Sequence, residues 1–149
     1  MPKVSEQVLI PHSADNLYEL VRDIRRYPEF IKWIRTVSVD DEQTDEVGNY
    51  ACLGTATVSF KGFDERFSSH VKADPIARKI DVNLASGPFR HLRNRWQFDP
   101  REDGKTRVHC FIDYEFKNPV LRLLARTNSR LAVDRIIDAF RAEADRRFV

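Results

Sequence analysis

The spacing of hydrophobic residues predicts a strand and then a helix at the start of the chain. Residues 3–10 alternate apolar and polar side chains, with Val4, Val8 and Ile10 on one face, as a half-buried strand does. Helical spacing follows Ser13, whose side chain is of the type that caps helix N-termini. The residues at this spacing are Leu17, Leu20, Val21 and Ile24. Because proline disfavours helix in the residue before it, we expect Pro28 to stop this helix.

The segment RRYPEFIKWI, residues 25–34, follows that helix, and we expect a separate short helix or turn from Tyr27 to Ile34. The segment carries three aromatic rings, with basic residues between and beside them. A connecting segment that exposed all of these rings to water would be prone to association. Two interpretations are open: the rings plug the hydrophobic core, or they form the rim of an opening.

From the end of this segment to residue 117 the hydrophobic period is two, which predicts a series of short strands. The alternating apolar sets are Phe63, Phe67, Val71 and Ala73; Ile80, Val82 and Leu84; Leu92, Trp96 and Phe98; and Val108, Cys110, Ile112, Tyr114 and Phe116. Turn residues such as Gly62, Asp74-Pro75 and Gly87-Pro88 separate these sets. This pattern is typical of an antiparallel meander with one buried and one solvated face.

The last 30 residues return to helical spacing and predict one long helix. Its apolar stripe consists of Leu121, Leu124, Leu131, Ile136, Ile137, Phe140 and Phe148. A strand, two short helices, about six strands and a long helix together indicate an α+β fold. Because a long antiparallel sheet twists and curls, the last helix is the natural cover for its concave face.

Small side chains on the predicted inward face raise the question of a cavity. The inward row of the strand at residues 50–60 is Tyr50, Cys52, Gly54, Ala56, Val58 and Phe60. Ser69, Ala73, Asn94 and Cys110 also have inward parity. Either bulky side chains from the helix complete an ordinary core, or the sheet encloses a ligand-sized space. The pattern alone favours neither interpretation.

Charge and composition exclude several functional classes. With 25 basic and 23 acidic residues in 149, the chain has a formal net charge of +2 and no overall polyanion-binding character. The length fits one domain, and the longest apolar runs are far too short to cross a membrane. Two cysteines form neither a disulfide framework nor a metal motif, so an intracellular, reduced protein is expected.

Candidate catalytic chemistry is sparse in the sequence. The four histidines, at positions 12, 70, 91 and 109, form no ligand pair, and no nucleophile-elbow, phosphate-binding or dinucleotide-binding motif occurs. Glu65 has inward parity between Phe63 and Phe67, where it could act as an acid, a base or a hydrogen-bond partner, unless a bulge or parity slip exposes it. Asn94 and Asn128 interrupt apolar faces and are candidates for contacting a ligand carbonyl. No pair of residues indicates catalysis, and no metal site is expected.

The arginines of the last helix have two interpretations. A basic amphipathic helix can contact a membrane or RNA. More often such a face is only solvated, and its basic residues pair with acids one helical turn away. Asp134, four residues after Arg130, has the spacing for such a pair.

Three stretches resemble the coenzyme Q-binding branch of the START-like superfamily, a group also described as polyketide cyclase/dehydrase that includes the RatA-type proteins. They are YPEFIKW at 27–33, GPFRHLRNRWQF at 87–98 and DYEFKNPVLRLL at 113–124. The resemblance covers essentially the whole chain, with the elements in the same order. The sequence departs from the family pattern at Lys32, Ser59 and His70, where proline, glycine and arginine are common.

This resemblance implies a helix-grip fold in a single lipid-binding domain, residues 1–149: a curved seven-stranded antiparallel sheet around the long C-terminal helix, with two short helices after the first strand. It implies that a polyprenyl quinone, such as ubiquinone, binds in an apolar tunnel and supports respiration, with no other cofactor required. Transferred to this sequence, the ligand-binding residues are Tyr27, Phe30, Trp33, Ala56, Phe67, Phe89, Trp96, Leu124, Asn128 and Leu131. The residues expected to face anionic membrane lipids are Arg25, Arg26, Lys32 and Arg35.

The resemblance leaves three functions to compare. The first is non-enzymatic quinone binding by a cytoplasmic protein that sits peripherally at the inner face of a membrane. The second is a RatA-like interaction with the ribosome that inhibits subunit association. The third is a cyclase or dehydratase acting on a polyketide-like substrate, for which the sequence offers no catalytic residues. DNA is not an expected partner.

Overall fold

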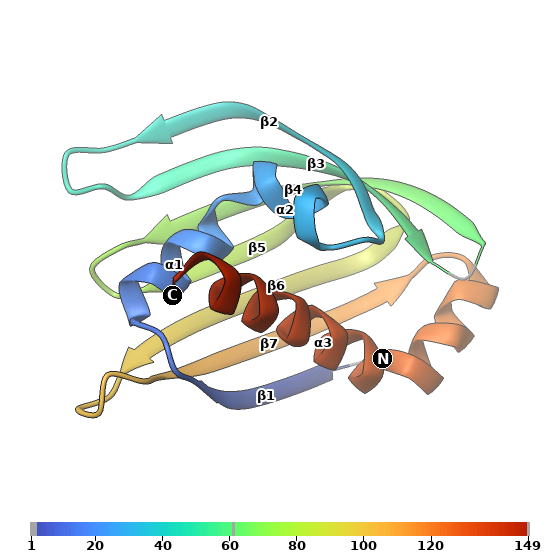
Figure 1. Ribbon diagram of the computed structural model, residues 1–149. Coiled ribbons are helices and arrows are strands. Elements are labelled where there is room, and N and C mark those ends of the chain that lie inside the picture. The colour runs from blue at the N-terminus through green and yellow to red at the C-terminus, as the bar shows by residue number, and fades with distance from the viewer. Residues whose placement is uncertain (1–2, 61, 149) are drawn as a thin grey trace.

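The computed structural model describes residues 3–60 and 62–148 and consists of one curved antiparallel sheet packed against helices (Figure 1). The seven strands are β1 (Lys3–Ile10), β2 (Ile34–Thr44), β3 (Tyr50–Phe60), β4 (Phe63–Asp74), β5 (Lys79–Ser86), β6 (Phe89–Pro100) and β7 (Thr106–Phe116). Their order in the sheet is β1-β7-β6-β5-β4-β3-β2, so β2 to β7 form the predicted meander and β1 joins its far edge. The long helix α3 (Pro119–Arg147) crosses the concave side. The predicted α+β arrangement is confirmed.

The first helix, α1 (Ala14–Arg22), begins as predicted at Ser13, whose hydroxyl accepts a hydrogen bond from the backbone N–H of Asn16. The helix ends at Arg22 and is followed by a 3-10 turn, η1 (Ile24–Arg26), and by the short helix α2 (Tyr27–Phe30). Pro28 therefore does not stop α1. It lies in the first turn of α2, where a missing backbone N–H costs no helical hydrogen bond.

The predicted inward faces of β6 and β7 are confirmed. Trp96, Phe98 and Tyr114 are buried, and the outward side chains that alternate with them are exposed or half-buried. Within the core, the Trp96 ring stacks on Phe98 and meets the edge of Phe140 from α3. A smaller apolar cluster around Phe89, Tyr114 and Ala125 lies under the first half of α3.

Helix α3 begins at Asn118, whose side chain accepts hydrogen bonds from the backbone N–H groups of Val120 and Leu121. Its first turns and its later turns run in different directions (Figure 1). Near this change, the Thr127 hydroxyl and the Asn128 amide donate to backbone carbonyls one turn earlier, contacts that commonly bend helices. Among the described residues, no helix has both the length and the apolar character needed to cross a bilayer.

Candidate functional site

An apolar cavity of about 190 Å³ lies between the concave face of the sheet and the helices. The short elements η1 and α2 contribute Ile24 and Tyr27 to its wall, and α3 contributes Ile136 and Phe140. Its walls are formed by Val21, Ile24, Tyr27, Ile31, Ile34, Val37, Gly54, Ala56, Phe67, Ser69, Val71, Ile80, Val82, Leu92, Asn94, Trp96, Ile112, Ile136 and Phe140. An apolar space of roughly 150 Å³ is enough to hold a benzene ring. The cavity therefore accepts a substituted ring or a short hydrocarbon segment.

Small residues on β3 affect the interior in two different ways. Ala56 lines the cavity opposite Phe67 of β4, and its short side chain leaves the space open. At Gly54, by contrast, an added Cβ would come within 2.6 Å of the Ile24 side chain. The missing side chain at Gly54 lets the 3-10 turn pack against the sheet, so this position is filled by a neighbour. The side chain of Phe60, also expected to point inward, lies outside the part of the structure that is described.

Most polar atoms in the cavity wall are already hydrogen-bonded to the protein. The Tyr27 hydroxyl donates to the Val21 carbonyl. The Trp96 indole N–H donates to the side-chain oxygen of Asn94 at 2.8 Å, and the Asn94 amide donates to the Phe111 carbonyl at 2.8 Å. Burial raises the pKa of the Tyr27 phenol, which keeps that hydroxyl neutral. The wall is thus apolar and uncharged, and Asn94 makes a structural contact with the neighbouring strand.

Ser69 is the exception in this wall. Ser69 is 7% exposed and lines the cavity. Among the described residues, no hydrogen bond joins its hydroxyl to the protein. The hydroxyl of a residue that lines the cavity can donate a hydrogen bond to a ligand oxygen there. The inward parity of Ser69 was visible in the sequence, but it was not predicted as a site residue.

A second pocket, of about 260 Å³, adjoins the cavity along α3. We call it the mouth pocket; it is lined by Trp33, Ser59, Asn128, Leu131, Ala132, Arg135 and Ile136. Ile136 lines both spaces, so the cavity and the mouth pocket lie next to each other. Leu131 is 48% exposed, which places the mouth pocket at the surface.

The residues predicted to bind a ligand fall into three groups. Tyr27, Ala56, Phe67 and Trp96 line the cavity, and Trp33, Asn128 and Leu131 line the mouth pocket. Phe30, Phe89 and Leu124 line neither space. The Phe30 ring packs against Tyr27 and Phe140, and the Phe89 ring stacks on Phe116 in the smaller cluster. Both rings therefore pack against other side chains of the core and do not face the cavity. Hydrophobic spacing alone cannot distinguish a core residue from a residue that lines a cavity.

The structure also distinguishes the parts of the aromatic segment. Ile31 is 1% exposed, and the rings of Tyr27 and Phe30 pack on Phe140 of α3, so these three side chains plug the core. Trp33 is half-buried and lines the mouth pocket. The two interpretations of this segment thus apply to different residues.

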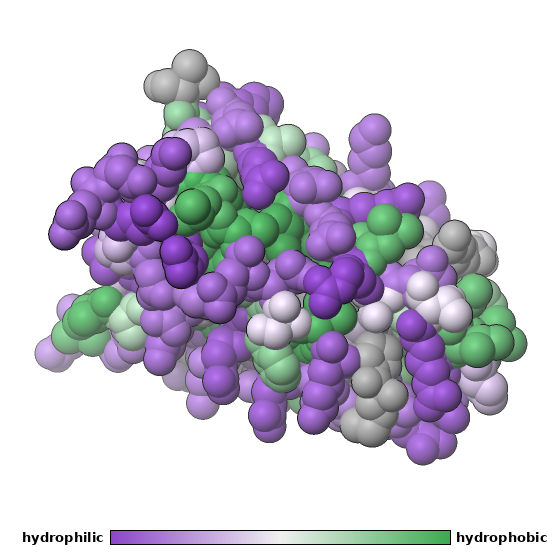
Figure 2. Space-filling model, turned by 90° about the horizontal axis from the view of Figure 1, so that it is seen from below, coloured by the Kyte–Doolittle hydropathy of each residue, from purple (hydrophilic) through white to green (hydrophobic). Residues whose placement is uncertain are grey.

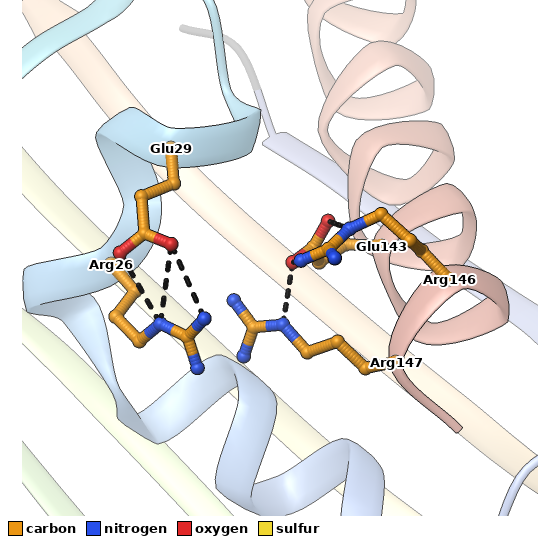
Figure 3. Close-up of polar contacts among 5 residues, drawn as sticks. All are labelled: Arg26, Glu29, Glu143, Arg146 and Arg147. Carbon is orange, nitrogen blue, oxygen red and sulfur yellow. Dashed lines mark hydrogen bonds and ion pairs between the residues drawn. The ribbon is translucent and has the colours of Figure 1, made fainter. Parts of the chain in front are cut away.

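Three of the four basic residues predicted to face a membrane contact acids. Arg25 pairs with Glu42, Arg26 with Glu29, and Arg35 with Asp64. Lys32 is exposed. Figure 3 shows the Arg26–Glu29 pair facing the last turn of α3, where Arg146 and Arg147 both bind Glu143. Because each neighbouring acid offsets a positive charge, this region attracts anions less strongly than its sequence suggests.

Glu65 keeps its inward parity. Strands β3 and β4 pair without a register shift, Glu65 lies opposite Val58, and its side chain is half-buried. The interpretation with a bulge or parity slip is therefore wrong. Glu65 is nevertheless not one of the residues that line the cavity or the mouth pocket.

A curved antiparallel sheet wrapped around a long helix, with an apolar cavity between them, defines the helix-grip class of proteins. The family model for polyketide cyclase/dehydrase and lipid transport matches residues 10–141. The chain therefore belongs to this START-like family, as the sequence motifs predicted.

Relatives in the family carry different names. The ribosome association toxin RatA of Rickettsia prowazekii is 30% identical over 139 residues, which is 91% of this chain and 91% of the relative. The mitochondrial coenzyme Q-binding protein coq10 of Schizosaccharomyces pombe is 26% identical over 137 residues, covering 91% of this chain and 82% of the relative.

Two solved structures show the same fold. The solution structure of the 18 kDa protein CC1736 from Caulobacter crescentus has a TM-score of 0.82 and 34% identity, covering 98% of this chain and 97% of that one. A START superfamily protein from Mycobacterium smegmatis has a TM-score of 0.82 and 20% identity, covering 97% of each chain. The likeness of the second structure supports the fold alone.

Proposed function

We propose that this protein binds a polyprenyl quinone without chemically changing it, with the quinone ring in the cavity and the prenyl tail leaving through the mouth pocket. The apolar cavity of about 190 Å³, with the Ser69 hydroxyl in its wall, is the main support for this proposal. The volume suits a ring and excludes a long tail. The mouth pocket beside Ile136 offers the tail a way to the surface.

The chemistry of a quinone fits this wall. Its two carbonyl oxygens accept hydrogen bonds and its ring is apolar, and the Ser69 hydroxyl can donate to one carbonyl while aromatic rings such as Trp96 and Phe67 contact the ring. The name of the fission yeast relative, a coenzyme Q-binding protein, supports the same ligand class. We further propose that the protein works at the inner face of a membrane, where such a ligand resides, and in support of respiration.

Catalysis on a polyketide-like substrate is a weaker alternative. Among the residues that the structure describes, those that line the cavity include no aspartate, glutamate, histidine or lysine. Burial raises the pKa of Tyr27, the phenol among them, and its hydroxyl is engaged with a backbone carbonyl. General acid–base catalysis needs a group that exchanges protons near neutral pH.

A second candidate function is association with the ribosome. The similarity to RatA of Rickettsia prowazekii over 91% of this chain favours it. This function would use the outer surface, and it is compatible with an occupied cavity. Co-sedimentation with ribosomal subunits tests it separately from lipid binding.

Filling the cavity tests the proposed function. Ala56→Trp places a large ring in the open space, and we expect it to lower the affinity for a short-chain ubiquinone at least tenfold. A hollow site tolerates this ring, so the free energy of unfolding should fall by less than the roughly 1–3 kcal/mol typical of overpacked cores. The matched control is Ala85→Trp on the solvated side of β5, which should bind quinone normally. Equal affinity in all three proteins, measured by fluorescence titration, would contradict the proposal.

A further inference from the structure

The first half of α3, with the residues just before it, is basic and contains no acid. Residues 117–133 include Lys117, Arg122, Arg126 and Arg130 but no aspartate or glutamate, whereas residues 134–147 contain four acids. Three large apolar side chains of the same segment are exposed: Val120 (55%), Leu123 (63%) and Leu131 (48%). The segment therefore combines uncompensated charge in its sequence with apolar surface.

Helical geometry brings these apolar side chains together. Val120, Leu123, Thr127 and Leu131 are three or four residues apart and share one face of the helix. Figure 2 shows apolar and hydrophilic residues side by side at the end of the molecule where the first turns of α3 lie. Leu121 and Ala125 lie on the opposite face and are buried against the sheet. The exposed stripe is thus additional to the side chains that hold the helix in place.

The basic residues of the segment are used differently. The Arg122 guanidinium donates to the backbone carbonyls of Phe116 and Lys117, and Arg130 contacts Glu6 of β1. Lys117 and Arg126 are exposed, and among the described residues neither has an acid within ion-pair distance. These two cations lie beside the exposed apolar side chains, and their positive charges would attract an anionic surface.

We propose that this stripe, formed by Lys117, Val120, Leu123, Arg126 and Leu131, docks onto the surface of an anionic lipid bilayer. At a bilayer interface, exposed apolar side chains can insert among the acyl chains while neighbouring basic side chains contact the anionic headgroups. RNA is a poorer fit, because residues 117–133 contain no aromatic ring on which a base could stack.

Docking through this stripe has a consequence for the mouth pocket. Leu131 belongs both to the stripe and to the lining of the mouth pocket, so the bound bilayer lies next to the opening. A prenyl tail could then pass between bilayer and cavity without crossing water. This role rests on the proposed quinone binding, but docking itself is measurable without any ligand. We propose this stripe as the membrane-contact surface in place of the segment at residues 25–35, because the three arginines of that segment pair with acids.

Vesicle co-sedimentation tests the proposal with two double variants and a matched control. Val120→Ser with Leu123→Ser removes the apolar contacts, and Lys117→Gln with Arg126→Gln removes the exposed charges. The control, Ile76→Ser with Lys79→Gln, makes the same kinds of change at two exposed positions, one in the β4–β5 connection and one at the start of β5, at the other end of the molecule. All changes are on the surface, and melting curves identify any variant that fails to fold.

The native chain should bind phosphatidylcholine vesicles containing phosphatidylglycerol more tightly than pure phosphatidylcholine vesicles, and salt should weaken this preference. We expect both α3 variants to lose roughly tenfold or more in affinity, the charge variant to lose the preference for phosphatidylglycerol, and the control to behave like the native chain. Folded α3 variants that bind these vesicles normally would overturn the proposal. So would vesicle binding by none of the proteins, or a loss of only ribosome binding or self-association in the α3 variants.

Quinone titration in the absence of vesicles separates this proposal from the proposed function. The α3 variants should bind short-chain quinone normally, and Ala56→Trp should bind vesicles normally. A native chain that docks through α3 but binds no quinone would refute the proposed function alone. A native chain that binds quinone but docks elsewhere would refute only the role of α3.

Discussion

At the scale of single residues, Ser69 places a hydroxyl donor in the wall of the apolar cavity. Its hydroxyl makes no hydrogen bond among the described residues, so Ser69→Ala removes no contact within the protein. We expect the affinity for short-chain ubiquinone to fall roughly 3- to 10-fold, as the loss of one hydrogen bond predicts, while thermal stability stays unchanged or rises.

The neighbouring Ser68 provides the control for this prediction. Its hydroxyl is 2.8 Å from the hydroxyl of Thr55, away from the cavity. Ser68→Ala should therefore leave quinone affinity unchanged. If both alanine variants bind quinone like the native chain, Ser69 does not contact the ligand.

At the scale of elements, the last turn of α3 is stabilised by a buried carboxylate. Glu143 is 5% exposed and binds both Arg146 and Arg147, and the hydrogen bond from Arg146 is the main reason that its pKa falls to about 2 (Figure 3). A carboxyl group with a lowered pKa in the folded state stabilises the fold above its unfolded pKa, near 4.5, and loses this contribution as pH falls toward 2.

We therefore expect Glu143→Gln to lower the free energy of unfolding by roughly 1–2 kcal/mol at pH 7, a value reduced by solvent screening of the exposed Arg146. Urea unfolding at several pH values measures the effect. The difference between the native chain and the variant should shrink steadily from pH 5 toward pH 2.5. A difference that is independent of pH would show that the carboxylate charge is not the source of stability.

The elements also show where hydrophobic spacing stops being informative. Ile24 continues the helical spacing of α1, yet the helix ends at Arg22 and Ile24 packs over Gly54 from a 3-10 turn. This contact joins residues 30 positions apart, so local spacing could not reveal it. Likewise, Leu131 belongs to the apolar stripe predicted for the last helix but is half exposed, because α3 changes direction and buries different faces along its length.

At the scale of the whole molecule, most of the fold could be predicted from the sequence. Strand alternation and the turns between strands predicted the meander, because a two-residue period with one wet face has few other structural solutions. The small inward side chains suggested that a cavity was possible, but the sequence did not show where it lies. Whether Ala56 faces empty space and Gly54 faces Ile24 depends on how the helices sit on the sheet, which no single-strand pattern records.

The same limit applies to the charged surface. Arg25, Arg26 and Arg35 appear as a basic cluster in the sequence, but their acids come from β2, α2 and β4. The first half of α3 lacks acids in the sequence itself, so its basic character was readable. What the sequence did not show is that its leucines are exposed.

Quinone binding in the cavity can be tested by identifying what the protein holds when it is isolated from cells. The native protein and Ala56→Trp would be purified without detergent, extracted with organic solvent and analysed by mass spectrometry. We expect a prenylated quinone in the native extract, near-stoichiometric with protein, and its loss from the Ala56→Trp extract. A native extract with no quinone, or equal amounts in both extracts, would contradict the proposed quinone binding.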